Sequence, residues 1–170
     1  MRNSEGDGGL NVLEFAITME TEGAEYYGGQ AERNKGNSLA PVCLMLQEDE
    51  KNHARILRNR MQELPYELKD SITVLKAKTI FRNVQNLRIE EIGVLSQLDF
   101  YSIAAQKEKQ SIELYTGLLE KAVDEQEKEL FSYLIAQEKK HFEIIDGLES
   151  LLRRAREWVE DAEFGNRGEY

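Results

Sequence analysis

The chain has 170 residues, a formal net charge of −10, 41% hydrophobic and 32% charged residues, and only two prolines. This length fits one domain with a substantial core, and the composition predicts an all-α protein because no strand-type alternation competes with helical periodicity. The negative charge argues against nucleic acid and anionic membranes as partners, since both bind basic faces. The single cysteine, Cys43, excludes a disulfide framework and a cysteine-rich metal site. No apolar stretch is long enough to cross a bilayer. For these reasons we expect a cytoplasmic protein.

The first half of the chain is predicted to form two long helices. Residues 10–33 have apolar residues at helical spacing, and the turn at residues 35–37 ends this helix at its glycine. Ser38 is the expected N-cap of the second helix, which tolerates Pro41 in its first turn and ends before Pro65.

The second half is predicted to repeat this plan after a long connection. Residues 66–87 form that connection and allow a short helix, and residues 89–121 form a third long helix. Asp124 and Glu127 resemble a capping box at the start of a fourth helix, which runs to about Ala162. Two short turns and one long connection predict a four-helix bundle with a single crossover, in which the second and third helices are parallel.

The predicted domain spans residues 10–162, including a C-terminal helical extension. It lies between a flexible N-terminal tail at residues 1–9 and a C-terminal tail at residues 163–170. Apolar residues at helical spacing mark the expected buried sides of the helices, among them Phe15, Leu44 and Ile103.

A short motif occurs twice and contains both histidines of the chain. Glu50-Lys51-Asn52-His53 is followed by Glu138-Lys139-Lys140-His141, and residue 138 lies 88 positions beyond residue 50. A carboxylate and an imidazole three residues apart share one face of a helix, so both can reach one cation. One such motif alone is more often part of a solvated helix face, so the repeat must extend further to indicate a site.

The same offset aligns the two halves of the chain without a gap. The matching pairs are Ala16 with Ala104, Glu20 with Glu108, Glu25 with Glu113, Tyr27 with Tyr115, Gly29 with Gly117, Glu32 with Glu120, Leu46 with Leu134 and Ile56 with Ile144. Each half is therefore predicted to be a helical hairpin with a mid-helix glutamate, Glu20 or Glu108, on its first helix. Packed about a pseudo-two-fold axis, the hairpins would bring four carboxylates and two imidazoles to the bundle centre.

Four glutamates in a dry interior need positive charge beside them. Without it they repel one another and are driven to protonate, since each uncompensated buried ion is costly. Two divalent cations cancel four negative charges, and carboxylates combined with imidazole suit iron or manganese. The predicted ligands are Glu20, Glu50, His53, Glu108, Glu138 and His141.

The pattern resembles the ferritin-like superfamily and, within it, the rubrerythrin-type di-iron carboxylate domains. It consists of Glu20-x-x-Gly23-x-x-x-Tyr27, Glu50-x-x-His53, Glu108-x-x-Ser111-x-x-x-Tyr115 and Glu138-x-x-His141. The resemblance implies a ferritin-like four-helix bundle with two iron ions, with manganese as the alternative and zinc as a substitute in a crystal. It also implies that Glu50 and Glu138 bridge the metals, with Glu20 and His53 at one end and Glu108 and His141 at the other. The bridging pair can also be assigned differently among the four glutamates.

The activity that the resemblance implies is reduction of hydrogen peroxide or dioxygen by a homodimer or larger homo-oligomer. A rubredoxin domain, which needs four cysteines, is not expected, so the electrons would come from a separate donor such as a rubredoxin-like protein. Ser111 stands where rubrerythrin has an extra glutamate implicated in redox-linked iron movement, so the resemblance implies metal binding more strongly than peroxidase activity. Two other functions stay open, a ferroxidase that handles iron and a non-enzymatic, metal-stabilised interaction or sensor module.

Tyr27 and Tyr115 are the candidate catalytic residues. Each follows a mid-helix glutamate by two turns on the same helix face, where a phenol can hydrogen-bond a ligand or relay an electron. The alternative for both is a buried core tyrosine with a satisfied hydroxyl. Cys43 is expected to pack as a small hydrophobe, and Glu22 and Glu25 are expected to be solvated surface charges.

Overall fold

The computed structural model describes residues 6–83 and 94–165, and within these ranges the chain forms five helices and no strand. For residues 6–11, 94–98, 155, 158–159 and 162–165 only the backbone is described. The helices are α1 (Gly6–Arg33), α2 (Leu39–Met61), α3 (Thr73–Asn83), α4 (Val94–Lys121) and α5 (Glu125–Gly165). The prediction of an all-α fold is confirmed.

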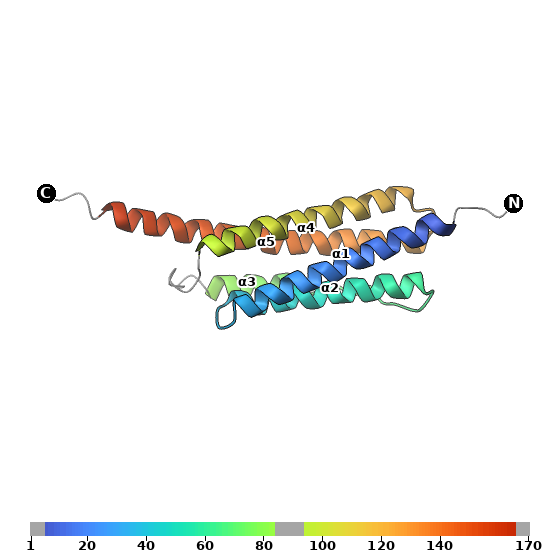
Figure 1. Ribbon diagram of the computed structural model, residues 1–170, viewed down its shortest axis with the longest axis horizontal. Coiled ribbons are helices and arrows are strands. Elements are labelled where there is room, and N and C mark those ends of the chain that lie inside the picture. Colours follow the sequence, from blue (N-terminus) through green and yellow to red (C-terminus); the bar gives the residue numbers. More distant parts are fainter. Residues whose placement is uncertain (1–5, 84–93, 166–170) are drawn as a thin grey trace.

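The long helices form an elongated bundle built from two hairpins (Figure 1). Helix α1 packs against α2, and α4 packs against α5, while α3 lies against α2 and α5. Helices α2 and α4 run in the same direction, as the prediction of a single crossover requires (Figure 1).

The first helix begins at Gly6 and therefore includes part of the predicted N-terminal tail. Glycine is a poor helix former, but propensity is a weak determinant at the end of a helix that is already nucleated, where each added residue extends the hydrogen-bond ladder. Residues 1–5 of the predicted tail lie outside the described residues.

The sequence predicted Ser38 as the N-cap of α2, but this prediction is wrong. The side chain that caps α2 is Asn37. The Oδ1 atom of Asn37 accepts a hydrogen bond from the Leu39 N–H at 2.9 Å. Ser38 has helical backbone angles, φ −70° and ψ −11°, and its side chain makes no capping hydrogen bond. An N-cap side chain reaches the first turn from extended backbone, which Ser38 does not adopt.

The end of α2 is closed by a left-handed residue ahead of Pro65. Glu63 has a φ of 56°, and the Leu64 N–H donates to the Asn59 carbonyl at 2.8 Å, the long hydrogen bond of a Schellman-type cap. The helix therefore ends at Met61, as Pro65 had indicated.

The long connection contains the short helix that its sequence allowed. Helix α3 buries Thr73 and Ala77, so the connection adds to the core and is not only a spacer. The predicted start of the third helix at Ile89 lies outside the described residues, whose helix α4 begins at Val94.

Only half of the predicted capping box forms at the start of α5. Asp124 Oδ1 accepts a hydrogen bond from the Gln126 N–H at 3.1 Å. The Glu127 carboxylate instead accepts from Arg60 of α2 at 3.2 Å, and Arg60 also donates to Asp124 at 2.9 Å. Glu127 therefore contributes to contact between the hairpins and leaves the local cap incomplete.

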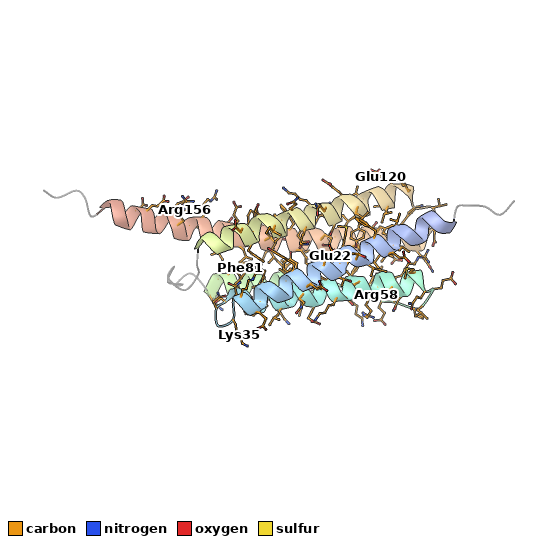
Figure 2. All side chains as sticks on the ribbon, in the orientation of Figure 1. Glu22, Lys35, Arg58, Phe81, Glu120 and Arg156 are labelled. Atoms are coloured by element: carbon orange, nitrogen blue, oxygen red, sulfur yellow. The ribbon has the colours of Figure 1, made fainter. Side chains whose placement is uncertain are left out.

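Helix α5 continues to Gly165, beyond the predicted end at Ala162, so residues 163–165 of the predicted C-terminal tail are helical. Residues 166–170 lie outside the described part. The C-terminal section of α5 extends past the other helices, and Arg156 marks it in Figure 2.

The buried apolar residues form two clusters, one toward each end of the bundle. The first includes Cys43, Leu46, Phe100 and Ile145, and the second includes Ile56, Leu57, Leu130 and Leu134. Between them, every long helix contributes buried polar residues, and these form the layer described below.

Three apolar residues predicted to be buried lie largely outside this core. Phe15, Leu44 and Ile103 are 56%, 49% and 45% exposed. Helical spacing identifies an apolar stripe, but the packing of neighbouring helices decides how much of that stripe is covered.

Candidate metal centre

The six predicted ligands come together in the middle of the bundle. Each is at most 4% exposed, and they fall into two groups whose ligand atoms all lie within 4.8 Å of one another. The first group is Glu20, Glu50, His53 and Glu138, and the second is Glu50, Glu108, Glu138 and His141. Glu50 and Glu138 belong to both groups, which is the arrangement expected of ligands that bridge two cations.

Both imidazoles turn their Nδ1 atoms toward the carboxylates. His53 Nδ1 lies 2.9 Å from Glu138 Oε1, 3.3 Å from Glu20 Oε2 and 3.5 Å from Glu50 Oε2. His141 Nδ1 lies 3.3 Å from Glu50 Oε1 and 3.6 Å from both Glu108 Oε2 and Glu138 Oε2. The two rings are roughly parallel, with centroids 5.4 Å apart and an interplanar angle of 21°.

These close contacts are not well-formed hydrogen bonds, and that favours a cation. Among the described residues, the buried atoms without a hydrogen-bond partner are Glu20 Oε2, His53 Nδ1, Glu108 Oε2, both carboxylate oxygens of Glu138 and His141 Nδ1. Buried polar atoms nearly always have a partner, because leaving one unsatisfied is costly. All six unpartnered atoms belong to the predicted ligands and have lone pairs suited to a metal, so the donor set fits two divalent cations.

The outer carboxylates are the ones that favour the protonated state when no cation is present. Burial raises the pKa of Glu20 well above its ordinary value, and the negative charges of Glu138 and Glu50 raise it further. Burial also raises the pKa of Glu108, and Glu50 and Glu138 add to the effect while His141 opposes it.

The shared carboxylates and the imidazoles favour the ionised state. Burial opposes ionisation of Glu50, but its contacts with Glu20, His141 and His53 outweigh burial and lower the pKa of its carboxyl. Burial and the charge of Glu50 oppose ionisation of Glu138, but His53 and His141 outweigh them and lower the pKa of that carboxyl. Burial alone would lower the pKa of the two histidines, yet the surrounding carboxylates raise it well above the ordinary value. Four ionised carboxylates carry four negative charges, which two divalent cations would balance.

The two tyrosines each contact the glutamate of the other hairpin. Tyr27 Oη donates a hydrogen bond to Glu108 Oε1, and Tyr115 Oη donates one to Glu20 Oε1. Burial, followed by the neighbouring carboxylates, raises the pKa of both phenols well above the ordinary value, so they act as neutral donors. Each hydrogen bond occupies one carboxylate oxygen and leaves Oε2 of the same glutamate facing the cluster.

The sequence interpretation missed the polar residues that surround the cluster. His141 Nε2 lies 3.2 Å from Asp49 Oδ2, and Gln137 is 1% exposed beside the connection. Burial opposes ionisation of Asp49, but hydrogen bonds from His141, Ser71 and Thr73 outweigh it and lower its pKa. The sequence feature that could have identified these two residues is their position next to a predicted ligand. Asp49 directly precedes Glu50, and Gln137 directly precedes Glu138.

A small cavity of about 40 Å³ connects the cluster to the surface between α1 and α4. Its lining consists of Met19, Glu22, Gly23, Tyr27, Glu50, Lys107, Glu108, Gln110 and Ser111. Glu22 lies near the middle of α1 in Figure 2 and is exposed, as predicted, so the cavity reaches solvent beside it. A cavity of this size holds on the order of three water molecules.

Cys43 does not belong to the cluster. It is fully buried in the first apolar cluster, and burial raises the pKa of its thiol to about 12. Its packing as a small hydrophobe is as predicted.

A protein-family model described as Rubrerythrin matches residues 11–149. This range contains all six predicted ligands and both tyrosines. Neither the curated proteins nor the solved structures gave a match. Of the helices in the described part of the chain, none combines the length and apolar character needed to cross a membrane.

Proposed function

We propose that this chain, which belongs to the rubrerythrin family, uses two bound iron ions to reduce hydrogen peroxide with electrons from a separate donor protein. The observation that carries the proposal is the pair of overlapping ligand groups sharing Glu50 and Glu138. Two cations held side by side can deliver two electrons to one substrate molecule.

The donor set supports iron, with manganese as the alternative. Each position has three carboxylates and one imidazole, and the only cysteine lies in the apolar core. Oxygen-rich sites with imidazole suit iron and manganese, whereas thiolate ligands are characteristic of structural zinc sites. In this proposal both ions would be held by Glu50 and Glu138, and Glu20 with His53 and Glu108 with His141 would complete the two ends.

The electron count favours peroxide over dioxygen. When bound, two ferrous ions would supply one electron each and become ferric, which with two protons converts one hydrogen peroxide into two waters. Complete reduction of dioxygen to water needs four electrons, twice what the pair supplies. The 40 Å³ cavity that reaches Glu50 and Glu108 also admits a molecule of peroxide size.

The protein would position the substrate and supply a proton nearby. Tyr27 lines the cavity and has its phenol proton directed at Glu108 Oε1, so it is the tyrosine suited to proton delivery. Tyr115 is not among the lining residues, and its role in the proposal is to orient Glu20. Both hydrogen bonds keep the outer glutamates in position as their charge changes.

The test is anaerobic mixing of the iron-loaded, reduced protein with either hydrogen peroxide or dioxygen in a stopped-flow spectrophotometer. We expect faster oxidation by peroxide, with one peroxide consumed for each pair of ferrous ions. A rate that is higher with dioxygen would contradict peroxide as the substrate. Continued oxidation of added excess Fe(II), with product retained on the protein, would instead indicate a ferroxidase.

A matched pair of variants ties the reaction to the proposed site. Glu138→Ala removes a residue of both ligand groups, whereas Glu129→Ala removes an exposed carboxylate of the same helix. Only the first is expected to abolish the reaction with peroxide, and equal activity in both variants would refute the assignment.

A further inference from the structure

The residues surrounding the cluster do not follow the repeat that relates the ligands. Asp49 and Gln137 occupy equivalent positions, each directly before the glutamate of its Glu-x-x-His motif. Asp49 has a carboxylate and Gln137 has an amide, and the two side chains make different contacts.

Asp49 contacts the histidine of the opposite hairpin. His141 Nε2 lies 3.2 Å from Asp49 Oδ2, and the carboxylate can only accept, so the imidazole Nε2–H is the donor. Ser71 Oγ donates to the same oxygen at 2.7 Å, and the Asp49 side chain is only 17% exposed. This contact holds His141 in the tautomer whose Nδ1 lone pair faces Glu108 and the shared glutamates.

Gln137 does not do the same for His53. Its Oε1 accepts from the Ser71 N–H at 3.4 Å, and its Nε2 donates to Asp70 Oδ1 at 3.0 Å, so both ends of the amide contact the connection. Within the described residues no hydrogen bond reaches His53 Nε2. That ring instead meets the Tyr133 ring edge to face, with centroids 6.3 Å apart.

The difference originates in the single connection between the hairpins. The segment that contains Asp70 and Ser71 occurs once, so it can interact with the two equivalent positions in only one arrangement. It supports Asp49 through the Ser71 hydroxyl and engages Gln137 through Asp70. One connection joining two equivalent hairpins therefore breaks their symmetry at this point.

We propose that Asp49 is a positioning residue that makes the two metal positions unequal, so that a divalent cation occupies the Glu108–His141 position before the Glu20–His53 position. This inference rests on the ligand assignment of the proposed function. A carboxylate that accepts from a ligating imidazole orients the ring and increases its basicity, and loss of such a partner typically costs roughly 10–100-fold in metal affinity.

The test is titration of the metal-free protein with Co(II), followed by visible absorption and by calorimetry. We expect the wild type to bind two equivalents in two resolved steps. Asp49→Ala should weaken the tighter step by roughly 10–100-fold and bring the two steps together. Asp49→Asn, which keeps the shape and one acceptor oxygen, should lie between the two, and it remains informative where alanine prevents folding. Glu48→Ala, which removes an exposed carboxylate from the same helix, is the matched control and should retain both steps.

Proton NMR of the Co(II)-loaded protein gives a second measurement, which a general loss of stability would not reproduce. We expect one strongly shifted imidazole N–H signal that exchanges slowly with water, from His141, and its loss in Asp49→Ala. Two equal binding steps in the wild type would overturn the inference while leaving the two-metal site intact. Unchanged steps in Asp49→Ala, or equal weakening of both, would also overturn it. Binding of fewer than two Co(II) ions by the wild type would overturn both the inference and the proposed function.

Discussion

Loading the cluster with two divalent cations is expected to raise the thermal stability of the protein by about 10–20 °C. The perturbation is the removal of metal by a chelator, followed by its replacement. The structure supplies the physical reason, because six buried atoms of the ligands lack hydrogen-bond partners among the described residues and each can bind a cation.

The magnitude follows from the two ligand groups. A cation present at a free concentration about 100 times its Kd stabilises the folded state by about 2.7 kcal/mol, so two independent positions contribute about 5 kcal/mol. In a domain of roughly 150–250 residues, 1 kcal/mol shifts Tm by about 2–4 °C. Together these values give the expected rise.

The assay is thermal unfolding followed by circular dichroism at 222 nm, with metal-free protein and with added Mn(II) or Co(II). Glu138→Ala, which alters both ligand groups, should lose most of the metal-dependent rise, whereas Glu129→Ala should retain it. A wild-type Tm that does not respond to metal, or an equal rise in both variants, would refute the reasoning.

Three further predictions concern single residues. Glu50→Ala should reduce the metal content of the purified protein further than Glu20→Ala does, because Glu50 belongs to both ligand groups and Glu20 to one. Glu20→Ala should leave about one ion per chain. Equal losses of metal in the two variants, measured by elemental analysis, would contradict this prediction. Tyr27→Phe removes the donor to buried Glu108 Oε1 and should lower the free energy of unfolding by about 1–3 kcal/mol in urea titrations, so an unchanged value would contradict that hydrogen bond. Cys43 should resist iodoacetamide at pH 8 until the protein is unfolded, because a thiol whose pKa is raised to about 12 has almost no reactive thiolate at that pH. Rapid labelling of the folded protein, detected by mass spectrometry, would contradict the burial of Cys43.

The ligands were accessible to sequence reasoning because the cluster is built from a repeat. Glu-x-x-His places two donors on one helix face by local geometry alone, and the second copy of the motif indicates that two such faces meet. The four-helix fold followed from the same repeat together with the lengths of the connections.

The contacts between the two hairpins could not be predicted from the repeat. Tyr27 was predicted to hydrogen-bond a ligand or relay an electron, but its position on the helix face of Glu20 did not indicate which glutamate it contacts. Its hydroxyl donates to Glu108 of the other hairpin. Asp49 similarly contacts His141 across the bundle. Such partners depend on the relative position of helices far apart in the sequence, for which the helical period contains no information.

The capping contacts at the ends of helices also depend on backbone geometry and on neighbouring side chains, which the residue types alone do not specify. Ser38 and Asn37 are both good capping residues. The helical backbone angles of Ser38 and the hydrogen bond from the Leu39 N–H to Asn37 Oδ1 show that Asn37 is the one that reaches the first turn. Glu127 is well placed in sequence for a capping box, but the nearby Arg60 guanidinium provides a competing partner.

The sequence by itself determined the helices, the number of hairpins and the chemistry available at the centre, because these depend on local periodicity and on residue types repeated in register. Only the tertiary structure decided which glutamates are shared, which tyrosine lines the cavity and which histidine has a carboxylate behind it. The physical reason is that a repeat specifies equivalent helix faces, whereas the single connection, packed against one side of the bundle, makes their surroundings different.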